Sequence, residues 1–354
     1  MEACVQVSGE ALKHEAYLDP RTLAAVGSLD LRARMIVEGV MSGMHRSPYQ
    51  GFSIEFAQHR QYAPGDDTRF LDWKVYGKTD KLYLKQYQQE TNLDMIIMVD
   101  VSGSMSFPQK PGDKGDWSKF DYAATLAGAM SYLALRQQDR VALSLFSDKI
   151  RRATRLSNRQ DHWKSITGAL AGAQGEVQRA GVRGVDTAQK KREGKSSGRE
   201  IDEGTFGEQS KGLAEVFDRV VAKLTKRSLL VLISDLYDDL SAFEYALARL
   251  SHRGHDLIVL QVVDREEEEF SIRQASDFIG LEGEGRLAVN PAGLRTAYLK
   301  LFQQHTEAIE KTVRGFEFDY LKMRTDESFA GPLSHFLAKR ANAIAHGGAG
   351  GTGR

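Results

Sequence analysis

Three short apolar runs, each leading into an aspartate or a Ser-Asp pair, constrain the fold of this 354-residue chain more than any other feature. The runs are residues 95–99 before Asp100, residues 229–233 before Ser234 and Asp235, and residues 257–260 continuing to Val262, Val263 and Asp264. A continuous apolar run of this length is typical of a strand that is buried on both faces, as in a parallel sheet. The chain therefore has to cover both faces of such a sheet.

Segments with apolar residues at helical spacing lie between these runs and after them. The predicted helices are residues 120–136, 213–224, 242–250, 294–313 and 333–342. Three further strands are predicted at residues 141–146, at residues 150–154 as an antiparallel edge strand, and at residues 316–323. Strands that alternate with helices predict an α/β fold in which a mostly parallel sheet has helices on both faces.

The remaining segments differ in composition from this α/β pattern. Residues 1–90 combine helical spacing in residues 19–42 with aromatic, β-branched and turn residues further on, which predicts an N-terminal helical and β-rich extension. The α/β domain is expected to span residues 91–345. Residues 172–212 are rich in glycine, serine and charged residues, so burial cannot offset their ordering entropy and we predict a mobile insertion. The glycine-rich residues 346–354 are predicted to form a disordered tail.

Charge and cysteine content limit the classes of partner and compartment. The 48 Lys and Arg residues balance the 48 Asp and Glu residues, so we expect a protein or small-molecule partner and no nucleic acid. Cys4 is the single cysteine, which excludes an internal disulfide and fits a reducing compartment. No apolar stretch reaches the roughly 20 residues of a membrane-spanning helix, and the first residues do not resemble a signal peptide. A cytoplasmic protein without a direct membrane span is therefore expected.

Acidic and hydroxyl residues gather at the predicted strand ends. Asp100 and Asp235 each end a buried strand, and ligands of open parallel sheets bind beyond the carboxyl ends of the strands. Ser102 and Ser104 follow at a spacing that lets a tight loop around Gly103 turn both hydroxyls toward the first carboxylate. Such an all-oxygen set suits an octahedral Mg²⁺ or Mn²⁺ ion better than zinc.

The Asp-x-Ser-x-Ser sequence after an apolar strand resembles the metal-ion-dependent adhesion site of von Willebrand factor A domains. The resemblance implies a Rossmann-like von Willebrand A fold in which Asp100, Ser102 and Ser104 form the first metal loop. Asp235 would belong to the third metal loop. The resemblance also implies an open coordination position on the ion, which takes an acidic side chain from a protein partner.

The second metal loop of such a site usually supplies a threonine. That loop should lie just before the helix predicted at residues 213–224, where Thr205 and Ser210 are both candidates. The insertion predicted at residues 172–212 falls in the same loop, and we hypothesise that it controls access to the ion.

A block of turn-forming, charged and aromatic residues upstream of the first core strand supports a second, more specific resemblance. The block is Gly51-x-x-x-Glu55-Phe56-x-x-x-Arg60-x-Tyr62-x-Pro64-Gly65-Asp66-Asp67-x-Arg69-x-x-Asp72-Trp73. It resembles the bacterial domain of unknown function 58 family, whose members pair a small β-rich region with a von Willebrand A-like domain. Members are commonly encoded beside MoxR-type AAA+ ATPases. The resemblance implies a partner or adaptor of such an ATPase in the assembly or maturation of other proteins.

The same block has a physical interpretation of its own. Charged side chains of both signs and two aromatic residues in so short a span predict a hydrogen-bonded network that locks the N-terminal region onto the sheet. The alternative is that the block presents a docking surface. The residues concerned are Arg60, Tyr62, Gly65, Asp66, Asp67, Arg69, Asp72 and Trp73.

A metal-dependent protein-binding module without catalytic residues is the preferred hypothesis for function. A metal-dependent phosphatase or hydrolase is one alternative, although Ser102 stands where aspartyl phosphatases carry a second aspartate. A scaffold without metal is the other. Asp148 and Asp264 also end apolar strands and are interpreted as caps, and residues 266–269 as a solvated helix start.

Overall fold

The computed structural model describes residues 20, 23, 26, 28–44, 58–63, 68, 71–86, 93–108, 117–193, 212–272, 276–282, 285–289 and 291–347. Its strands are β1 (Gln58–Gln61), β2 (Tyr83–Gln86), β3 (Asp94–Asp100), β4 (Arg140–Phe146), β5 (Ile150–Ala153), β6 (Ser228–Ser234), β7 (Asp256–Val263), β8 (Ser276–Ile279), β9 (Arg286–Val289) and β10 (Asp319–Arg324). The longer helices are α3 (Leu29–Met44), α5 (Lys119–Arg136), α6 (His162–Glu193), α7 (Gly212–Val221), α8 (Leu240–His252), α10 (Pro291–Gly315) and α11 (Ala330–Gly347). Shorter helical segments are α4 (Trp73–Thr79), η2 (Gly103–Ser106) and α9 (Arg265–Glu269).

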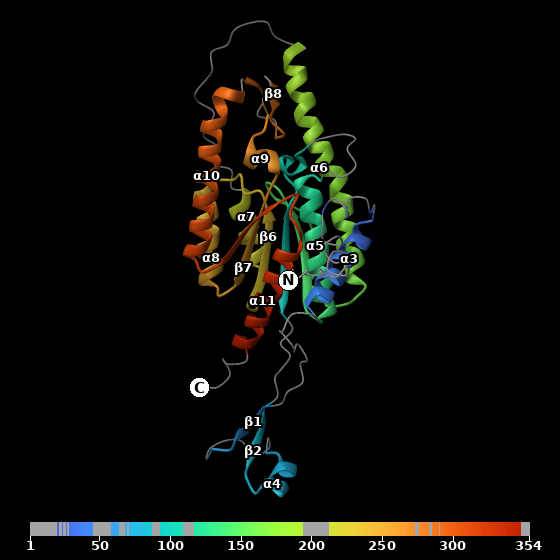
Figure 1. Ribbon diagram of the computed structural model, residues 1–354, viewed down its shortest axis with the longest axis vertical. Coiled ribbons are helices and arrows are strands. Elements are labelled where there is room, and N and C mark those ends of the chain that lie inside the picture. The colour runs from blue at the N-terminus through green and yellow to red at the C-terminus, as the bar shows by residue number, and fades with distance from the viewer. Residues whose placement is uncertain are drawn as a thin grey trace, which may run out of the picture.

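Six strands form the central sheet in the order β10-β7-β6-β3-β4-β5 (Figure 1). All neighbours are parallel except β4 and β5, which confirms the predicted antiparallel edge strand. The register sets Val99 of β3 level with Ile233 of β6, and Ser234 level with Gln261 of β7. The carboxyl ends of the parallel strands therefore meet at one edge of the sheet.

Helices cover both faces of this sheet, as predicted. Alternate residues of β3 belong to two different hydrophobic clusters, with Met95, Ile97 and Val99 on one face and Ile96 and Met98 on the other. The first cluster is completed by α3, α5, α6 and α11, and the second by α7, α8 and α10. The protein is thus a mixed α/β fold with a mostly parallel six-stranded sheet.

Helices α4 and α6 and the β8–β9 hairpin were not predicted from the sequence. Helix α6 runs on through residues 172–193, where we predicted the start of a mobile insertion. The Ala, Gln, Glu, Lys and Arg residues of this stretch are good helix formers, and their propensity outweighs the glycines. Helix α4 lies between β1 and β2, and β8 pairs with β9 as an antiparallel hairpin before α10.

The N-terminal part of the chain contributes two separate pieces. Helix α3 packs on α5, since Ala33, Ile36 and Val37 are buried in the first core cluster. Strands β1 and β2 pair with each other and, with α4, form a small unit that lies below the main body in Figure 1. Among the described residues, no helix is long and apolar enough to cross a membrane.

Candidate metal centre at the carboxyl edge of the sheet

A cleft of about 540 Å³ opens at the edge where the parallel strands end. Its lining includes all four residues that the sequence assigned to a metal site: Asp100, Ser102, Ser104 and Asp235. It also includes side chains from the neighbouring strand ends and loops, namely Ser147, Asp148, Glu215, Ser234, Tyr237, Asp238 and Glu282. The topology of the sheet therefore brings residues more than a hundred positions apart to one cleft.

Asp100 is held by the two loops that leave β3 and β6. The Ser102 backbone N–H donates to its Oδ1 at 2.8 Å, and the Ser234 hydroxyl donates to its Oδ2 at 2.6 Å. The hydroxyls of Ser102 and Ser104 lie 3.0 Å apart. One buried carboxylate and two adjacent hydroxyls thus face the same cleft, as the spacing of the three residues predicted.

Asp235, the second carboxylate, is fixed by a buried lysine. Lys119, at the first turn of α5, donates to Asp235 Oδ2 at 2.8 Å and to Glu267 Oε1 of α9 at 2.6 Å. Lys119 is fully buried and Asp235 is only 2% exposed. The ammonium group of Lys119 therefore links the start of α5 to the residue after β6 and to α9.

Lys119 was not among the site residues predicted from the sequence, and Glu267 was predicted to be solvated. Lys119 lies four and seven positions before Ala123 and Leu126, both of which belong to the buried face of α5. A lysine on an apolar helical face needs buried acceptors, and this signal was available. Asp264 caps α9 as predicted, but Glu267 is not the solvated residue that we expected, because it faces Lys119.

The turn after β6 places the Asp235 side chain. Leu236 has a positive φ of 58°, and its N–H donates to the Ser234 hydroxyl at 3.0 Å. Gln261 of β7 donates through Nε2 to the Asp235 carbonyl oxygen at 3.2 Å. Because the chain turns back at Leu236, the Asp235 side chain stays against Lys119 at the edge of the sheet.

Burial and like charge act together on Asp100. Burial, followed by the negative charge of Asp235, raises the pKa of Asp100 to about 7, against the hydrogen bonds from Ser234 and Ser102. Burial opposes the charged form of Lys119, yet the carboxylates of Asp235 and Glu267 raise its pKa above the ordinary value. Asp100 is thus a carboxylate whose charged form is opposed both by burial and by the charge of Asp235.

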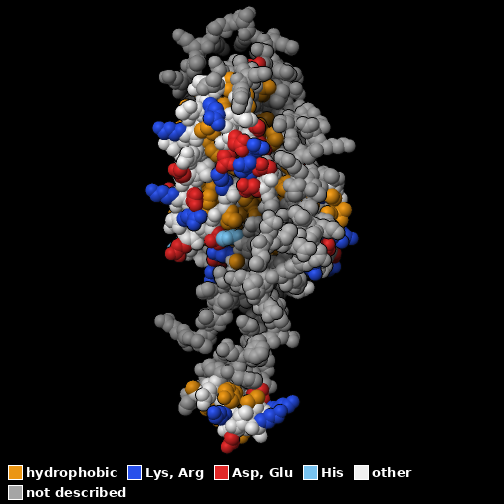
Figure 2. All heavy atoms as spheres, in the orientation of Figure 1, with side chains coloured by type: hydrophobic (Ala, Val, Ile, Leu, Met, Phe, Trp, Pro, Cys, Tyr) orange, Lys and Arg blue, Asp and Glu red, His pale blue; other side chains and the backbone are white. Residues whose placement is uncertain are grey.

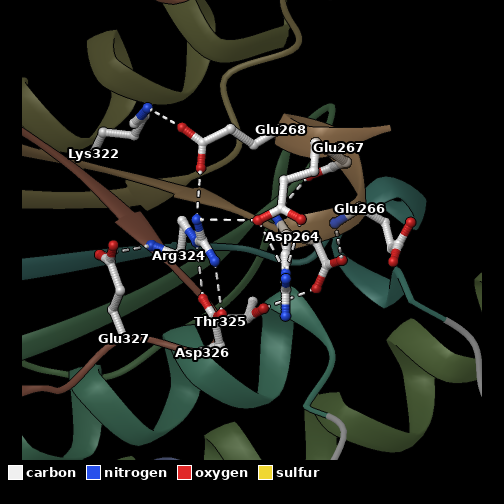
Figure 3. A network of polar contacts seen from close by, with 11 residues as sticks. Asp264, Glu266, Glu267, Glu268, Lys322, Arg324, Thr325, Asp326 and Glu327 are labelled. Atoms are coloured by element: carbon white, nitrogen blue, oxygen red, sulfur yellow. Dashed lines mark hydrogen bonds and ion pairs between the residues drawn. The ribbon is translucent and has the colours of Figure 1, made fainter. Parts of the chain in front are cut away.

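A surface network supports α9 and hence Glu267. Figure 2 shows acidic and basic side chains gathered around α9, and Figure 3 shows their contacts. Glu267 Oε2 accepts from the Asp264 N–H at 2.8 Å, and the Thr325 hydroxyl donates to Asp264 Oδ2 at 2.8 Å. Glu268 accepts from Lys322 and Arg324 of β10. The acidic run of α9 is therefore largely paired, with Glu267 facing inward.

The tip of the β8–β9 hairpin packs on the loop that holds Ser102 and Ser104. A Cβ added to Gly103 would lie 2.5 Å from the Leu281 carbonyl oxygen, so only glycine fits there. Glu282 Oε1 accepts from the Ser104 N–H at 3.2 Å. The hairpin, which was not predicted from the sequence, therefore covers part of the candidate site.

The other predicted site residues lie away from this cleft or beyond the described residues. Thr205, Ser210, Gly65, Asp66, Asp67 and Arg69 lie outside the described residues, and of Arg60 only its strand position in β1 is described. Tyr62 donates its N–H to the Leu82 carbonyl oxygen at 2.9 Å. Asp72 caps α4 by accepting from the Lys74 and Val75 N–H groups. Trp73 is 64% exposed and lies edge-on to Tyr76.

The donor set fits a hard divalent cation that keeps several waters. Asp100, Ser102, Ser104 and Asp235 offer carboxylate and hydroxyl oxygens, and Mg²⁺ is commonly held by one or two carboxylates with waters in its remaining positions. Within the described ranges no three His, Cys, Asp or Glu side chains gather closely enough to hold an ion by themselves. An ion here would therefore depend on the serine hydroxyls and on water.

Fold and cleft together define a mixed α/β protein with an acidic, hydroxyl-lined cleft at the carboxyl edge of its sheet. The chain belongs to the family described as protein of unknown function DUF58, which matches residues 58–308. An uncharacterized protein of Mycobacterium tuberculosis, Rv1480, is 24% identical over 327 residues, covering 91% of this chain and 90% of that protein. The uncharacterized protein Mb1516 of Mycobacterium bovis is similar to the same extent.

Two solved structures are similar at low identity. The conserved hypothetical protein BatB from Bacteroides thetaiotaomicron has a TM-score of 0.41 and 12% identity, covering 72% of this chain and 100% of that one. An aerotolerance-related membrane protein from Bacteroides fragilis has a TM-score of 0.43 and 11% identity, covering 71% and 100%.

Replacing Lys119 by methionine should destabilise the protein strongly. The change leaves Asp235 buried without its cation, and breaking a buried ion pair in this way costs about 3–5 kcal/mol. Lys322→Met is the matched control, since its partly exposed pair with Glu268 should contribute less than about 1 kcal/mol. Urea unfolding of both variants measures the difference, and equal losses would contradict the proposed importance of Lys119.

Asp100 should make stability fall as pH rises. Its folded pKa, about 7, lies above the ordinary value of 3.8, so the folded protein binds more protons than the unfolded chain between these values. In EDTA, Asp100→Asn should match the wild type near pH 4 and exceed its unfolding free energy by about 2–4 kcal/mol at pH 8.

Asp148→Asn is the control for this measurement. Asp148 also lines the cleft, but the Ser147 hydroxyl and Arg151 lower its pKa, so this variant should keep the wild-type pH dependence above pH 4. Thermal unfolding from pH 4 to pH 8 checks both variants. If the wild type instead gained stability relative to Asp100→Asn as the pH rises from 4 to 8, the charge of Asp100 would not be destabilising.

Gly103→Ala should destabilise the protein by about 1–3 kcal/mol, because the new methyl group meets the backbone of Leu281. Gly77→Ala in α4 is the control, since nothing lies within 4 Å of its added Cβ and alanine favours the helix. Chemical unfolding compares the two. An unchanged Gly103→Ala protein would mean that the hairpin tip does not pack on this loop.

Proposed function

We propose that this protein is a metal-dependent protein-binding module with a von Willebrand A-like fold. A Mg²⁺ or Mn²⁺ ion would be held by Asp100, Ser102 and Ser104, with Asp235 as the second carboxylate. The ion would supply a Lewis-acidic position for an acidic side chain of a protein partner. The observation behind the proposal is that these four residues line one cleft at the carboxyl edge of the sheet.

The balance of buried charge supports a divalent ion. Asp100, Asp235 and Glu267 are three carboxylates, and Lys119 is an ammonium group that donates to two of them, Asp235 and Glu267. When all four are ionised, two negative charges are left in a poorly hydrated place, where they are costly. A divalent cation would compensate both charges and would lower the pKa that burial and Asp235 raise at Asp100.

The side chains of the site have distinct roles in this proposal. The Ser234 hydroxyl and the Ser102 N–H orient the Asp100 carboxylate, which fixes the direction of its remaining lone pairs. Lys119 holds Asp235 at the edge of the sheet and reduces its charge, so an ion bound here would be exchangeable rather than permanent. Leu213, the first described side chain of α7, also lines the cleft, which is where the second metal loop is expected.

A MoxR-type AAA+ ATPase is the proposed partner, and assembly or maturation of other proteins is the proposed process. Both come from the resemblance to the family to which the chain belongs. The zero formal net charge suits a protein partner that is recognised by local contacts rather than by a global field.

Calorimetric titration of Mn²⁺ into the metal-free protein tests the metal site. The wild type should bind one equivalent, and Ser102→Ala, Ser104→Ala and Asp100→Ala should each weaken binding by at least about tenfold, because each removes an oxygen donor. Asp148→Asn, which removes a cleft carboxylate outside the predicted set, should bind like the wild type. The same weak signal in all five proteins would contradict the proposal.

Co-purification with the ATPase tests the role of the ion in partner binding. The wild-type protein should lose capture of the ATPase in EDTA and regain it when Mg²⁺ is added. Asp100→Ala should not capture the ATPase in either condition. Capture that ignores EDTA would favour the metal-free scaffold. Phosphatase turnover that is lost in Asp100→Asn would favour the enzyme alternative.

A further inference from the structure

The β8–β9 hairpin brings a carboxylate of the chain itself to the candidate metal loop. Its strands pair from Ser276 with Val289 to Ile279 with Arg286, and the Gly280 N–H donates to the Gly285 carbonyl oxygen at 2.8 Å. The hairpin is not part of the central sheet. Leu281 and Glu282, near its tip, nevertheless meet the loop after β3, and Glu282 lines the cleft.

The position of the tip is set by backbone contact rather than by a long flexible side chain. The Leu281 carbonyl oxygen would lie 2.5 Å from a Cβ at position 103, so the two backbones approach as closely as glycine permits. Helix α6 contacts both η2 and β8, and therefore packs on the loop as well as on the hairpin. Glu282 thus projects from a segment that is packed against the site.

Glu282 lies beside the loop that carries the proposed metal donors. It lines the same cleft as Asp100, Ser102, Ser104 and Asp235, and its Oε1 accepts from the Ser104 N–H at 3.2 Å. The Ser104 hydroxyl is one of the proposed metal donors, so the carboxylate of Glu282 is adjacent to that donor. Among the other carboxylates that line the cleft, Glu215 pairs with Arg219, Asp148 pairs with Arg151, and Asp238 accepts from the Leu213 N–H.

We infer that Glu282 is an internal ligand that occupies the partner's coordination position on the metal ion. The inference rests on the proposed function and deepens it, because it assigns the regulation of the same site. With an ion bound, the glutamate on the hairpin tip and the acidic residue of the partner compete for one position. Partner binding then requires the hairpin to move away from Gly103.

A simpler role for Glu282 makes a different prediction. Its carboxylate could serve only to accept a hydrogen bond from the Ser104 N–H at the start of η2. Glutamine also offers an acceptor oxygen of the same reach, but it is a much poorer ligand for a hard cation. Glu282→Gln therefore separates the two roles, and Glu282→Ala removes both.

Mn²⁺ binding monitored by water-proton relaxation tests the inference without a partner. Loss of an internal carboxylate ligand should weaken Mn²⁺ binding by about tenfold or more. It should also raise the relaxivity of the bound ion, because a water takes the vacated position. Glu282→Gln and Glu282→Ala should both show these changes, and Glu215→Gln should show neither, since it removes a cleft charge that is paired with Arg219.

The outcomes separate the inference from the proposal on which it rests. Wild-type Mn²⁺ affinity and relaxivity in both Glu282 variants would overturn the internal ligand and leave the metal site standing. Weaker binding in Glu282→Ala alone would assign Glu282 the hydrogen-bonding role and overturn the inference as well. Absence of saturable Mn²⁺ binding to the wild type would overturn the proposed function and the inference together. Circular dichroism melts confirm that each variant is folded.

Discussion

The buried ion pair between Lys119 and Asp235 is the interaction on which the candidate site depends. Lys119 contacts Asp235 and Glu267, and it thereby ties the start of α5 to the end of β6 and to α9. The polar network around α9 in turn orients Glu267. Without this lysine, the edge of the sheet would contain three neighbouring carboxylates and no fixed cation. The same lysine holds Asp235 in the position from which its negative charge raises the pKa of Asp100.

The single positive charge of Lys119 does not neutralise the three carboxylates Asp100, Asp235 and Glu267 at this edge of the sheet. The proposed function follows from the negative charge that is left. Asp100 accepts hydrogen bonds at both carboxylate oxygens, yet burial and Asp235 still raise its pKa to about 7. A group of this kind binds either a proton or a cation near neutral pH. The two serine hydroxyls beside it favour a hard cation, and Glu282 on the hairpin offers the chain's own carboxylate to the same place.

The sequence predicted the features that depend on local pattern. The apolar runs before Asp100 and Asp235 predicted buried parallel strands, and the rule for parallel sheets placed both residues at one edge, where the structure has them. The serines at 102 and 104 were assigned to the same cleft from their spacing alone. These predictions succeeded because strand burial and loop spacing are encoded within a few residues of each other.

Features that depend on distant contacts were missed. Lys119 is a helix residue whose role is visible only when α9 and β6 are placed beside it, although its position on an apolar face was a signal. The β8–β9 hairpin has short strands with weak alternation, so neither its pairing nor the approach of Leu281 to Gly103 could be predicted. Residues 172–193 were interpreted as mobile from their glycine and charge content, but the helix propensity of their Ala, Gln, Glu, Lys and Arg residues outweighed the glycines.

Anomalous diffraction from crystals grown with Mn²⁺ tests the central claim most directly. A divalent ion at the sheet edge predicts one anomalous peak in the cleft, within coordination distance of the Ser102 and Ser104 hydroxyls and on the side of Asp100. A cleft without a peak at saturating Mn²⁺, or a peak only at the acidic surface around α9, would contradict it.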